Sequence, residues 1–301
     1  MKKRSPLLFA FLAIMMALLV SCSQEVPKTS LSPEEAIAQV LDRTYGKYNE
    51  EFNARIVVAN SYCVSAPDGG IDCDPFRDEH VRDTSDYYMN VARIDRIDSA
   101  DYLAERSYDG AGHKYYVLLT GHGVPRCRAC TGMFGAFVFE WQNGQWEVTS
   151  SAPHVLDGTS GEPATSWRPI RLDNADFWGW IAHHSGGSWH GHHYKWAKIH
   201  APHKDKIIPV FKWTTTYNYA GTWYQNRPEG KQHPEETDLE MDIHLDYPPE
   251  NANIYSLKAT ISGKVKGKKI KPKTFTIPFD EKEWKYKPPK EYEAYAKLMG
   301  G

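Results

Sequence analysis

Polar and apolar residues alternate along much of the C-terminal half of the chain. From residue 239 to residue 247 every second residue is apolar, and the segment 257–265 has nearly the same pattern. Because successive side chains of a strand point to opposite faces, each segment predicts a strand with one buried face and one wet face. The intervening segment YPPENAN predicts an antiparallel hairpin, and a third strand is expected at residues 211–219.

In the N-terminal half, strands are expected near residues 54–62, 114–120, 132–142 and 146–150. The segment from Phe134 to Trp141 is apolar at both alternations except for Glu140, which predicts a central strand that is buried on both faces. Asn143 and Gly144 follow, and this pair favours the positive φ angles of a two-residue hairpin turn.

Two helices are expected at the ends of the mature chain. Ser32, Pro33 and Glu35 supply an N-cap, a first-turn proline and an acidic first turn, so a helix of about 14 residues should end near Tyr45. A short helix is expected near 289–299. The segment 151–167 is rich in Gly, Pro, Ser and Thr, which favours a boundary. We therefore predict an α+β fold, with a mixed domain at 32–153 that contains one long helix and a β-rich domain at 165–301, built as an antiparallel β-sandwich or an open barrel.

The N-terminus has the pattern of an export signal. Three basic residues at 2–4 precede an apolar run of 14 residues at 7–20, which is shorter than the roughly 20 residues of a membrane-spanning helix. The ending Leu-Val-Ser-Cys at 19–22 resembles the lipobox of bacterial lipoproteins. The resemblance implies a signal peptide at 1–21 that is removed, acyl chains such as palmitate on Cys22, and a tether at 22–31. An ordinary secretory signal with an incidental cysteine is the alternative.

The same resemblance implies where the protein resides. Several acyl chains hold a protein stably at a membrane, so the membrane is a partner through the N-terminal lipid. Ser23, which follows the modified cysteine, indicates the outer membrane, with the protein facing the periplasm. The resemblance covers only this segment, and no family is identified for the mature domain.

Composition and charge limit the classes of partner. Hydrophobic residues make up 41% of the 301 residues, which is sufficient for a packed core. The net charge is −2, and loss of three basic residues with the signal peptide changes it to −5, because 33 basic residues then remain against 38 acidic ones. This mixed charge forms no extended basic field, so nucleic acid is not expected as a partner.

Four cysteines remain once Cys22 is assigned to lipid, and thiols outside the cytoplasm are expected to be oxidised. Of the three possible pairings, we prefer Cys63 with Cys73, which flank a turn-forming loop, and Cys127 with Cys130. The spacing Cys-Arg-Ala-Cys is also typical of thiol–disulfide enzymes, although those place the motif at a helix N-terminus and the segment that follows here has a strand pattern. A periplasmic thiol–disulfide enzyme that uses Cys127 and Cys130 is therefore an alternative hypothesis.

Histidines are concentrated in the segment HHSGGSWHGHH at 183–193, which holds five of the 13 in the chain. In an extended segment His190 and His192 share a face, and His183 or His184 can approach them across the turn. Neutral imidazoles suit Zn, Cu or Ni, so His183, His184, His190 and His192 are a candidate metal site. No acidic residue lies between Asp176 and Asp205 to orient such ligands. A solvated loop in which His and Trp pack together is the interpretation we prefer for this segment.

Aromatic residues and lysines provide two further signals. Ten tryptophans and 18 tyrosines suggest stacking against sugar rings, although most buried aromatics form core. The candidates for such a platform are Trp178, Trp180, Trp189, Trp196, Trp213 and Trp223. Six lysines within 264–273 predict an edge strand that resists aggregation.

The sequence contains neither a nucleophile elbow nor a phosphate-binding loop, so no enzyme activity is expected from these motifs. We predict a cell-envelope lipoprotein that acts as a non-catalytic binding module, for which a transition metal bound by the His-rich segment is a candidate ligand. The alternatives are the thiol–disulfide enzyme and a structural envelope lipoprotein that contacts glycan or another protein.

Overall fold

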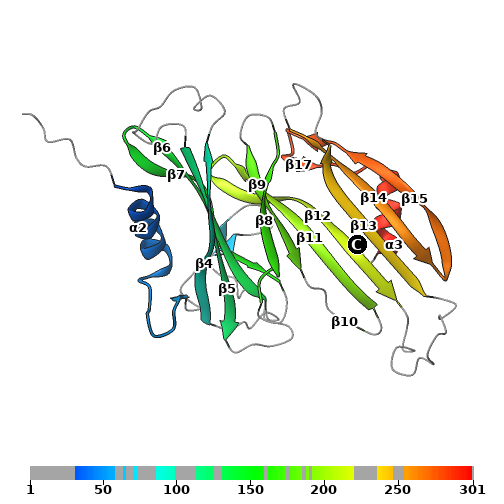
Figure 1. Cartoon of the computed structure of the whole chain (residues 1–301), viewed down its shortest axis with the longest axis horizontal. Helices are drawn as coiled ribbons and strands as arrows, with labels where there is room; N and C mark the ends of the chain where they lie inside the picture. The colour runs from blue at the N-terminus through cyan, green and yellow to red at the C-terminus, as the bar shows by residue number, and fades with distance from the viewer. Residues whose placement is uncertain are drawn as a thin grey trace, which may run out of the picture.

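The protein is an elongated β structure that carries two helices (Figure 1). The structure is a computed structural model, and it describes residues 31–57, 64–65, 71–72, 86–98, 113–124, 131–158, 162–173, 177–184, 188–189, 192–219, 236–246 and 254–299. All five cysteines, and His190 and Trp223, lie outside these residues.

Thirteen strands belong to one sheet. They are β1 (Arg55–Val57), β4 (Asp86–Asp98), β5 (His113–Val124), β6 (Gly132–Gln142), β7 (Gln145–Asp157), β8 (Ser166–Arg171), β9 (Trp178–His184), β10 (Ser188–Trp189), β11 (His192–His203), β12 (Lys206–Tyr219), β13 (Thr237–Asp246), β14 (Ser256–Val265) and β15 (Lys268–Ile277). The order across the sheet is β1-β4-β5-β6-β7-β12-β11-β9-β8, β10 pairs with β11, and β13, β14 and β15 continue from β12. The remaining strands form the pairs β2 (Val64–Ser65) with β3 (Ile71–Asp72) and β16 (Phe279–Asp280) with β17 (Lys285–Tyr286).

The predicted α+β class is wrong, because the protein is mostly β. The described residues contain two helices, α2 (Pro33–Tyr45) of 13 residues and α3 (Lys290–Leu298) of nine. Long strands fill the half that was expected to be mixed, and β4 was missed. The pairing of β4 with β5 shifts register between Val91 and Arg93, and such a bulge interrupts the period-two pattern that identifies a strand.

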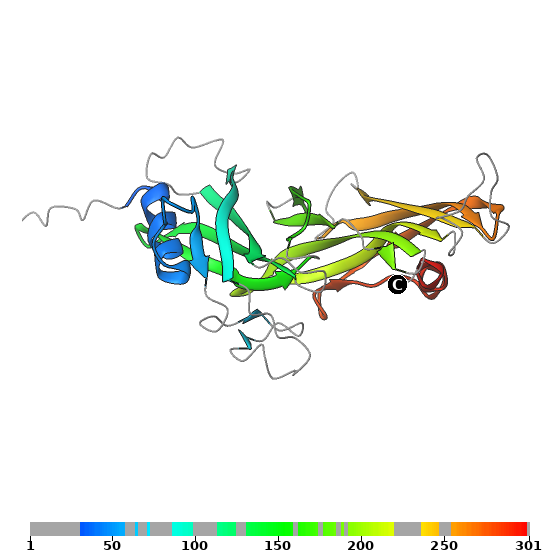
Figure 2. The same ribbon diagram turned by 90° about the horizontal axis from the view of Figure 1, so that it is seen from below.

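Helix α2 begins where the sequence predicts. The Ser32 hydroxyl accepts a hydrogen bond from the Glu35 amide at 3.2 Å, and the Glu35 carboxylate accepts one from the Ser32 amide at 2.9 Å, which completes a capping box. Ile37, Leu41 and Tyr45 are buried against the sheet, and the Tyr45 hydroxyl donates to the carbonyl of Pro153. The helix therefore covers one face of the β4–β7 region (Figures 1 and 2).

Strand β6 lies at the centre of this region and is buried on both faces, as predicted. Met133, Phe137 and Phe139 belong to the core beneath α2, whereas Phe134 and Val138 belong to a second core that includes Trp180 of β9. The turn after β6 is also confirmed, because Asn143 and Gly144 have φ angles of 52° and 80° and join β6 to β7.

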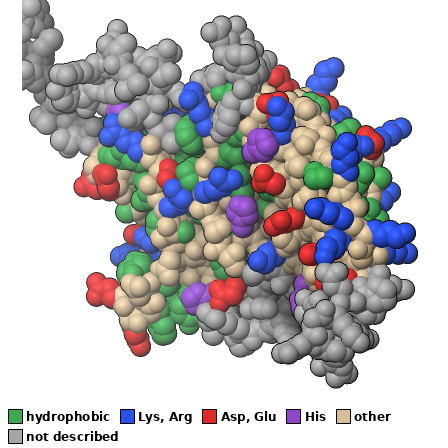
Figure 3. Space-filling view, turned by 45° about the vertical axis from the view of Figure 1, so that its right-hand side comes forward, with side chains coloured by type: hydrophobic (Ala, Val, Ile, Leu, Met, Phe, Trp, Pro, Cys, Tyr) green, Lys and Arg blue, Asp and Glu red, His purple; other side chains and the backbone are tan. Residues whose placement is uncertain are grey.

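The strands β13, β14 and β15 form the right-hand end of the molecule in Figure 1. Burial alternates without interruption along the first nine residues of β13, and β13 pairs with β14 as the sequence predicts. Strand β15 is an edge, since its pairing is with β14. Four of the six lysines of 264–273 lie on this edge, namely Lys268, Lys269, Lys271 and Lys273. Basic side chains gather on the side of the C-terminal strands in Figure 3.

The two regions of the sheet are joined by a short backbone connection. Strand β7 pairs with β12 in parallel at Ser151 and Lys206, and the Ser151 amide donates to the Asp205 carbonyl at 2.9 Å. The Ser150 hydroxyl adds a bond to the Lys204 carbonyl at 2.6 Å. With so few backbone bonds between β7 and β12, the relative placement of the two regions depends on side-chain contacts.

Candidate functional site

Three of the four histidines of the predicted metal site, His183, His184 and His192, are described by the structure, and they do not lie together. His183 and His184 are consecutive on β9 and so point to opposite faces. His184 is paired with Trp196, whereas His192 lies four residues away on β11, which is about 13 Å along a strand. Within the described ranges no group of three His, Cys, Asp or Glu side chains is placed to hold a metal ion. Because His190 lies outside those ranges, the four-histidine site stays a prediction.

His184 instead belongs to a buried group of charged and polar residues, which we call the Asp157 cluster: Asp157, His184, Lys198 and His200. The Lys198 ammonium donates to Asp157 Oδ1 at 2.7 Å. The other carboxylate oxygen, Oδ2, lies 3.4 Å from His184 Nε2 and 4.0 Å from His200 Nε2. These two contacts are longer than hydrogen bonds, and none of the three atoms has a hydrogen-bond partner. The cluster is therefore polar, mostly buried and only partly satisfied by hydrogen bonds.

Three strands bring the cluster together. Asp157 is the last residue of β7, His184 is the last residue of β9, and Lys198 and His200 lie two residues apart on β11. In the register of β9 and β11, His184 opposes Trp196 and Trp180 opposes His200, so both imidazoles lie on the face that meets β7. The Gly158 amide donates to Asp157 Oδ1 at 2.8 Å and fixes the carboxylate at the end of its strand.

Burial keeps both imidazoles neutral. It lowers the pKa of His184 to about 4 and the pKa of His200 to about 3, in spite of the opposing effect of the Asp157 carboxylate. Burial alone would raise the pKa of Asp157, but the charge of Lys198, with further contributions from the two histidines, holds this pKa below its usual value. At neutral pH the cluster thus contains one ion pair and two neutral imidazoles.

Aromatic rings close the cluster off from solvent. The His184 ring is stacked on Trp196, with centroids 5.0 Å apart and planes 6° apart. The His200 ring lies edge-on to Phe134 at 4.9 Å and near Trp167 at 5.8 Å. His184 and His200 approach Asp157 Oδ2 from β-sheet positions four residues apart along the strand direction, which is a separation of about 13 Å. The two Nε2 atoms nevertheless lie 3.4 and 4.0 Å from the same carboxylate oxygen, so Asp157 links both imidazoles.

Sequence reasoning identified only one member of the Asp157 cluster. Because no acidic residue lies between Asp176 and Asp205, a carboxylate partner for the histidines had to come from elsewhere in the fold, and beside His184 and His200 the structure supplies Asp157 from β7. The alternation along β11 was the available signal, because it places Lys198 and His200 on the same face as His192 in the absence of a bulge. No local pattern indicates which distant strand packs on that face.

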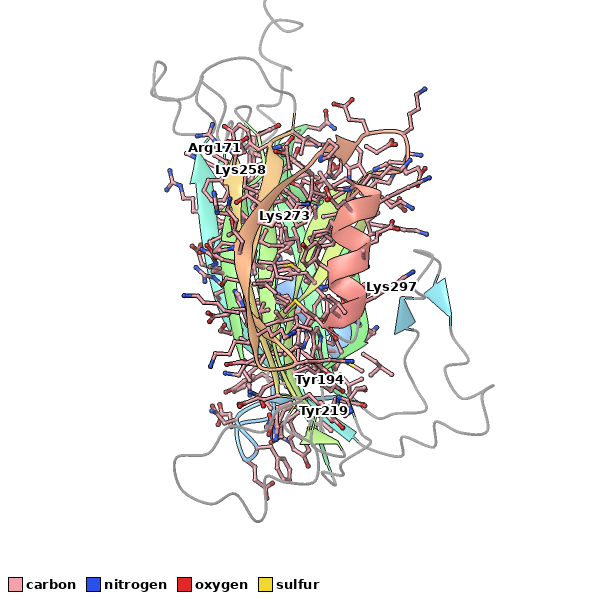
Figure 4. All side chains as sticks on the ribbon, turned by 90° about the vertical axis from the view of Figure 1, so that its right-hand side faces the viewer. Arg171, Tyr194, Tyr219, Lys258, Lys273 and Lys297 are labelled. Atoms are coloured by element: carbon pink, nitrogen blue, oxygen red, sulfur yellow. The ribbon has the colours of Figure 1, made fainter. Side chains whose placement is uncertain are left out.

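A second feature is a series of aromatic side chains on β11 and its neighbour β12, part of which is exposed to solvent. We call it the aromatic row: His192, Tyr194 and Trp196 of β11 with Tyr217 and Tyr219 of β12. His192 is stacked on Tyr219 with centroids 4.3 Å apart, and His192 Nδ1 is 2.8 Å from the Tyr217 hydroxyl. Tyr194 lies 5.5 Å from Trp196 and is 39% exposed. Figure 4 places the labelled Tyr194 and Tyr219 near each other at one end of the sheet.

A cavity of about 270 Å³ adjoins this row. Tyr194, Trp196, Lys212 and Thr214 line it together with residues of β13 and α3.

The tryptophans of the predicted sugar platform differ in burial. Trp180 and Trp213 are buried in the core, whereas Trp178 and Trp196 are only partly buried. Trp223 and the side chain of Trp189 lie outside what is described.

Comparison with known proteins provides no relative of this chain. No protein-family model, no curated protein and no solved structure matches it. The predicted cysteine pairs and the Cys127/Cys130 redox site fall outside the described residues. A function for this chain is therefore inferred from the aromatic row, the cavity beside it and the N-terminal sequence.

The Asp157 cluster predicts a specific loss of stability in acid. Because the pKa values of His184 and His200 are lowered in the folded protein, the unfolded chain binds protons first as the pH falls below about 6.5. The free energy of unfolding should therefore fall between pH 6.5 and pH 4, with a slope of up to about 1.4 kcal/mol per pH unit for each histidine. Urea unfolding at a series of pH values measures this slope.

The double variant His184→Gln with His200→Gln should have a shallower slope, whereas His244→Gln, which changes an exposed histidine, should leave the slope unchanged. An equal slope in all three proteins would show that the buried pair does not control the acid response.

Proposed function

We propose that the protein is a lipid-anchored binding module of the bacterial cell envelope and that its aromatic row binds glycan. The observation that carries the ligand class is the row itself, in which partly exposed rings continue along β11 and β12 beside a cavity. The anchoring rests on the lipobox-like segment and on Cys22. Neither helix in the described part of the chain is long and apolar enough to cross a bilayer.

The chemistry of the aromatic row suits a sugar. One face of a pyranose ring is apolar and stacks on an aromatic ring, while its hydroxyls need donors and acceptors nearby, which tyrosine and histidine provide. Single exposed aromatics are common on protein surfaces, but a contiguous series indicates a binding surface. Tyr194 is among the few large apolar side chains that the structure leaves exposed.

Polar groups of the row are held in fixed positions. Burial, with a contribution from Tyr219, raises the pKa of Tyr217, so its hydroxyl stays protonated at neutral pH and is held against His192. Lys212 and Thr214 of β12 border the adjoining cavity. Rings that are packed against one another lose little conformational entropy when a ligand stacks on them, which favours binding.

The row is also well connected to the rest of the protein. Trp196 contacts Tyr194 on one side and His184 of the Asp157 cluster on the other. The position of Trp196 therefore depends on the packing of β7, β9 and β11 around the Asp157 cluster. We expect the row to act as a preformed surface and not as a loop that orders on binding.

Removal of the lipid attachment site tests the anchoring. Cys22→Ser should move the protein from the membrane fraction to the soluble periplasmic fraction, because the thiol that carries the lipid is lost. Fractionation with an immunoblot measures the distribution, and Cys63→Ser is the matched control that should stay with the membrane. A Cys22→Ser protein that sediments like the unmodified protein contradicts lipid anchoring.

Isothermal titration with soluble peptidoglycan fragments tests the ligand class. Tyr194→Ala should weaken binding by about fivefold to tenfold, because it removes a stacking ring. Tyr194→Phe keeps the ring and should bind within about twofold of the unchanged protein. Tyr48→Ala removes a tyrosine of similar exposure outside the row and should have no effect.

Absence of heat with the unchanged protein, or equal weakening by Tyr48→Ala, would contradict glycan binding by the aromatic row. A loss in Tyr194→Phe equal to that in Tyr194→Ala would show that the hydroxyl, and not the stacking face, makes the contact.

A further inference from the structure

A second cavity lies in the C-terminal part of the sheet. None of the five residues of the aromatic row lines it, although Trp213 lines both this cavity and the one beside the row. The second cavity is a space of about 250 Å³ between β8 and β9 on one side and β13 and β14 on the other. Its wall is largely aliphatic, with Ile181, Ile199, Ile243, Leu245 and Leu257 among the lining residues. A cavity of about 150 Å³ with such a lining is already able to hold a benzene-sized molecule.

The cavity is amphipathic because two arginines of β8 line it. Arg168, Arg171 and His244 are the basic residues that line it, and no aspartate or glutamate is among the lining residues. Arg168 is exposed and makes no ion pair with the described residues. Burial lowers the pKa of His183, and the nearby positive charge of Arg168 lowers it further. An apolar space with an uncompensated cation favours an apolar ligand with an anionic group.

Two indole groups of the wall point to the same conclusion. Trp213 is 95% buried, and neither its Nε1 nor that of Trp178 has a hydrogen-bond partner. A buried N–H without an acceptor is unfavourable by about 1–3 kcal/mol. A ligand oxygen that reaches either N–H group would supply the missing acceptor.

We propose that this cavity binds a medium-chain fatty acid, with the hydrocarbon chain among the aliphatic residues and the carboxylate at Arg168. Each methylene needs about the space of a water molecule, roughly 30 Å³, so a cavity of about 250 Å³ fits a chain of about eight carbons. The carboxylate takes the charge-assisted hydrogen bonds that a guanidinium donates to two oxygens at once. The residues proposed to hold this ligand include none of the five residues of the aromatic row.

Isothermal titration of the full mature chain with sodium octanoate tests the proposal. Octanoate should bind with 1:1 stoichiometry, whereas octylamine, which has the same chain and the opposite charge, should not bind. Arg168→Gln should weaken octanoate binding about tenfold, because it removes the cation but keeps a polar side chain. Arg43→Gln, which changes an arginine at the end of α2, is the matched control and should bind like the unchanged protein.

A cavity-filling variant separates the cavity from the protein surface. Ile170 packs at the edge of the same core and lines the cavity, so Ile170→Phe should reduce octanoate binding at least fivefold while circular dichroism shows a folded protein. Tyr194→Ala should leave octanoate binding unchanged, which keeps this test separate from the test of the aromatic row.

Three outcomes would overturn the proposal. The first is absence of octanoate binding at millimolar concentration, and the second is binding of octanol as tight as that of octanoate, because the anionic group would then have no role. The third is unchanged octanoate binding in either Arg168→Gln or a folded Ile170→Phe protein. If Ile170→Phe fails to fold, the Arg168→Gln and octanol comparisons decide the question.

Discussion

The ion pair between Asp157 and Lys198 is the buried charged contact that joins the two sheet regions, beside the apolar core that Phe134 shares with Trp180. Backbone pairing between β7 and β12 is confined to the region of Ser151 and Lys206, which is too little to fix the angle between two large pieces of sheet. The carboxylate of Asp157 reaches from the end of β7 to β11 and is almost fully buried. A buried charge that loses its partner destabilises a protein by about 3–5 kcal/mol, so this contact strongly penalises other arrangements of the regions.

The same constraint positions the surfaces to which we assign function. Oδ2 of Asp157 lies beside the two neutral imidazoles of His184 and His200, and His184 is stacked on Trp196. The aromatic row therefore begins at a ring that the cluster holds in place. Strand β9 is held against β11 by the register that includes His184, and residues of β8, β9 and β13 line the aliphatic cavity. A single buried carboxylate thus connects the fold to both proposed binding sites.

The parts of the fold that were predicted correctly are those with a local signal. The capping box at Ser32, the Asn143–Gly144 turn and the alternation in β13 each depend on residues within about one element of each other. The α+β class was wrong because bulges, such as that near Val91 in β4, interrupt the alternation of long strands. The Asp157 cluster could not be predicted, since its members lie on three strands and Asp157 is 41 residues from Lys198. The aromatic row was predicted in part, because Trp196 was among the candidates but the tyrosines beside it were not.

A double-mutant cycle on Asp157 and Lys198 tests the central claim most directly. Asp157→Asn and Lys198→Met are made singly and together, and the free energy of unfolding is measured with urea at pH 7. The account predicts that each single variant is destabilised, that the double variant is less destabilised than the sum of the two, and that the coupling free energy exceeds about 1 kcal/mol. Additive effects, with a coupling below about 0.5 kcal/mol, would show that the ion pair does not join the two regions.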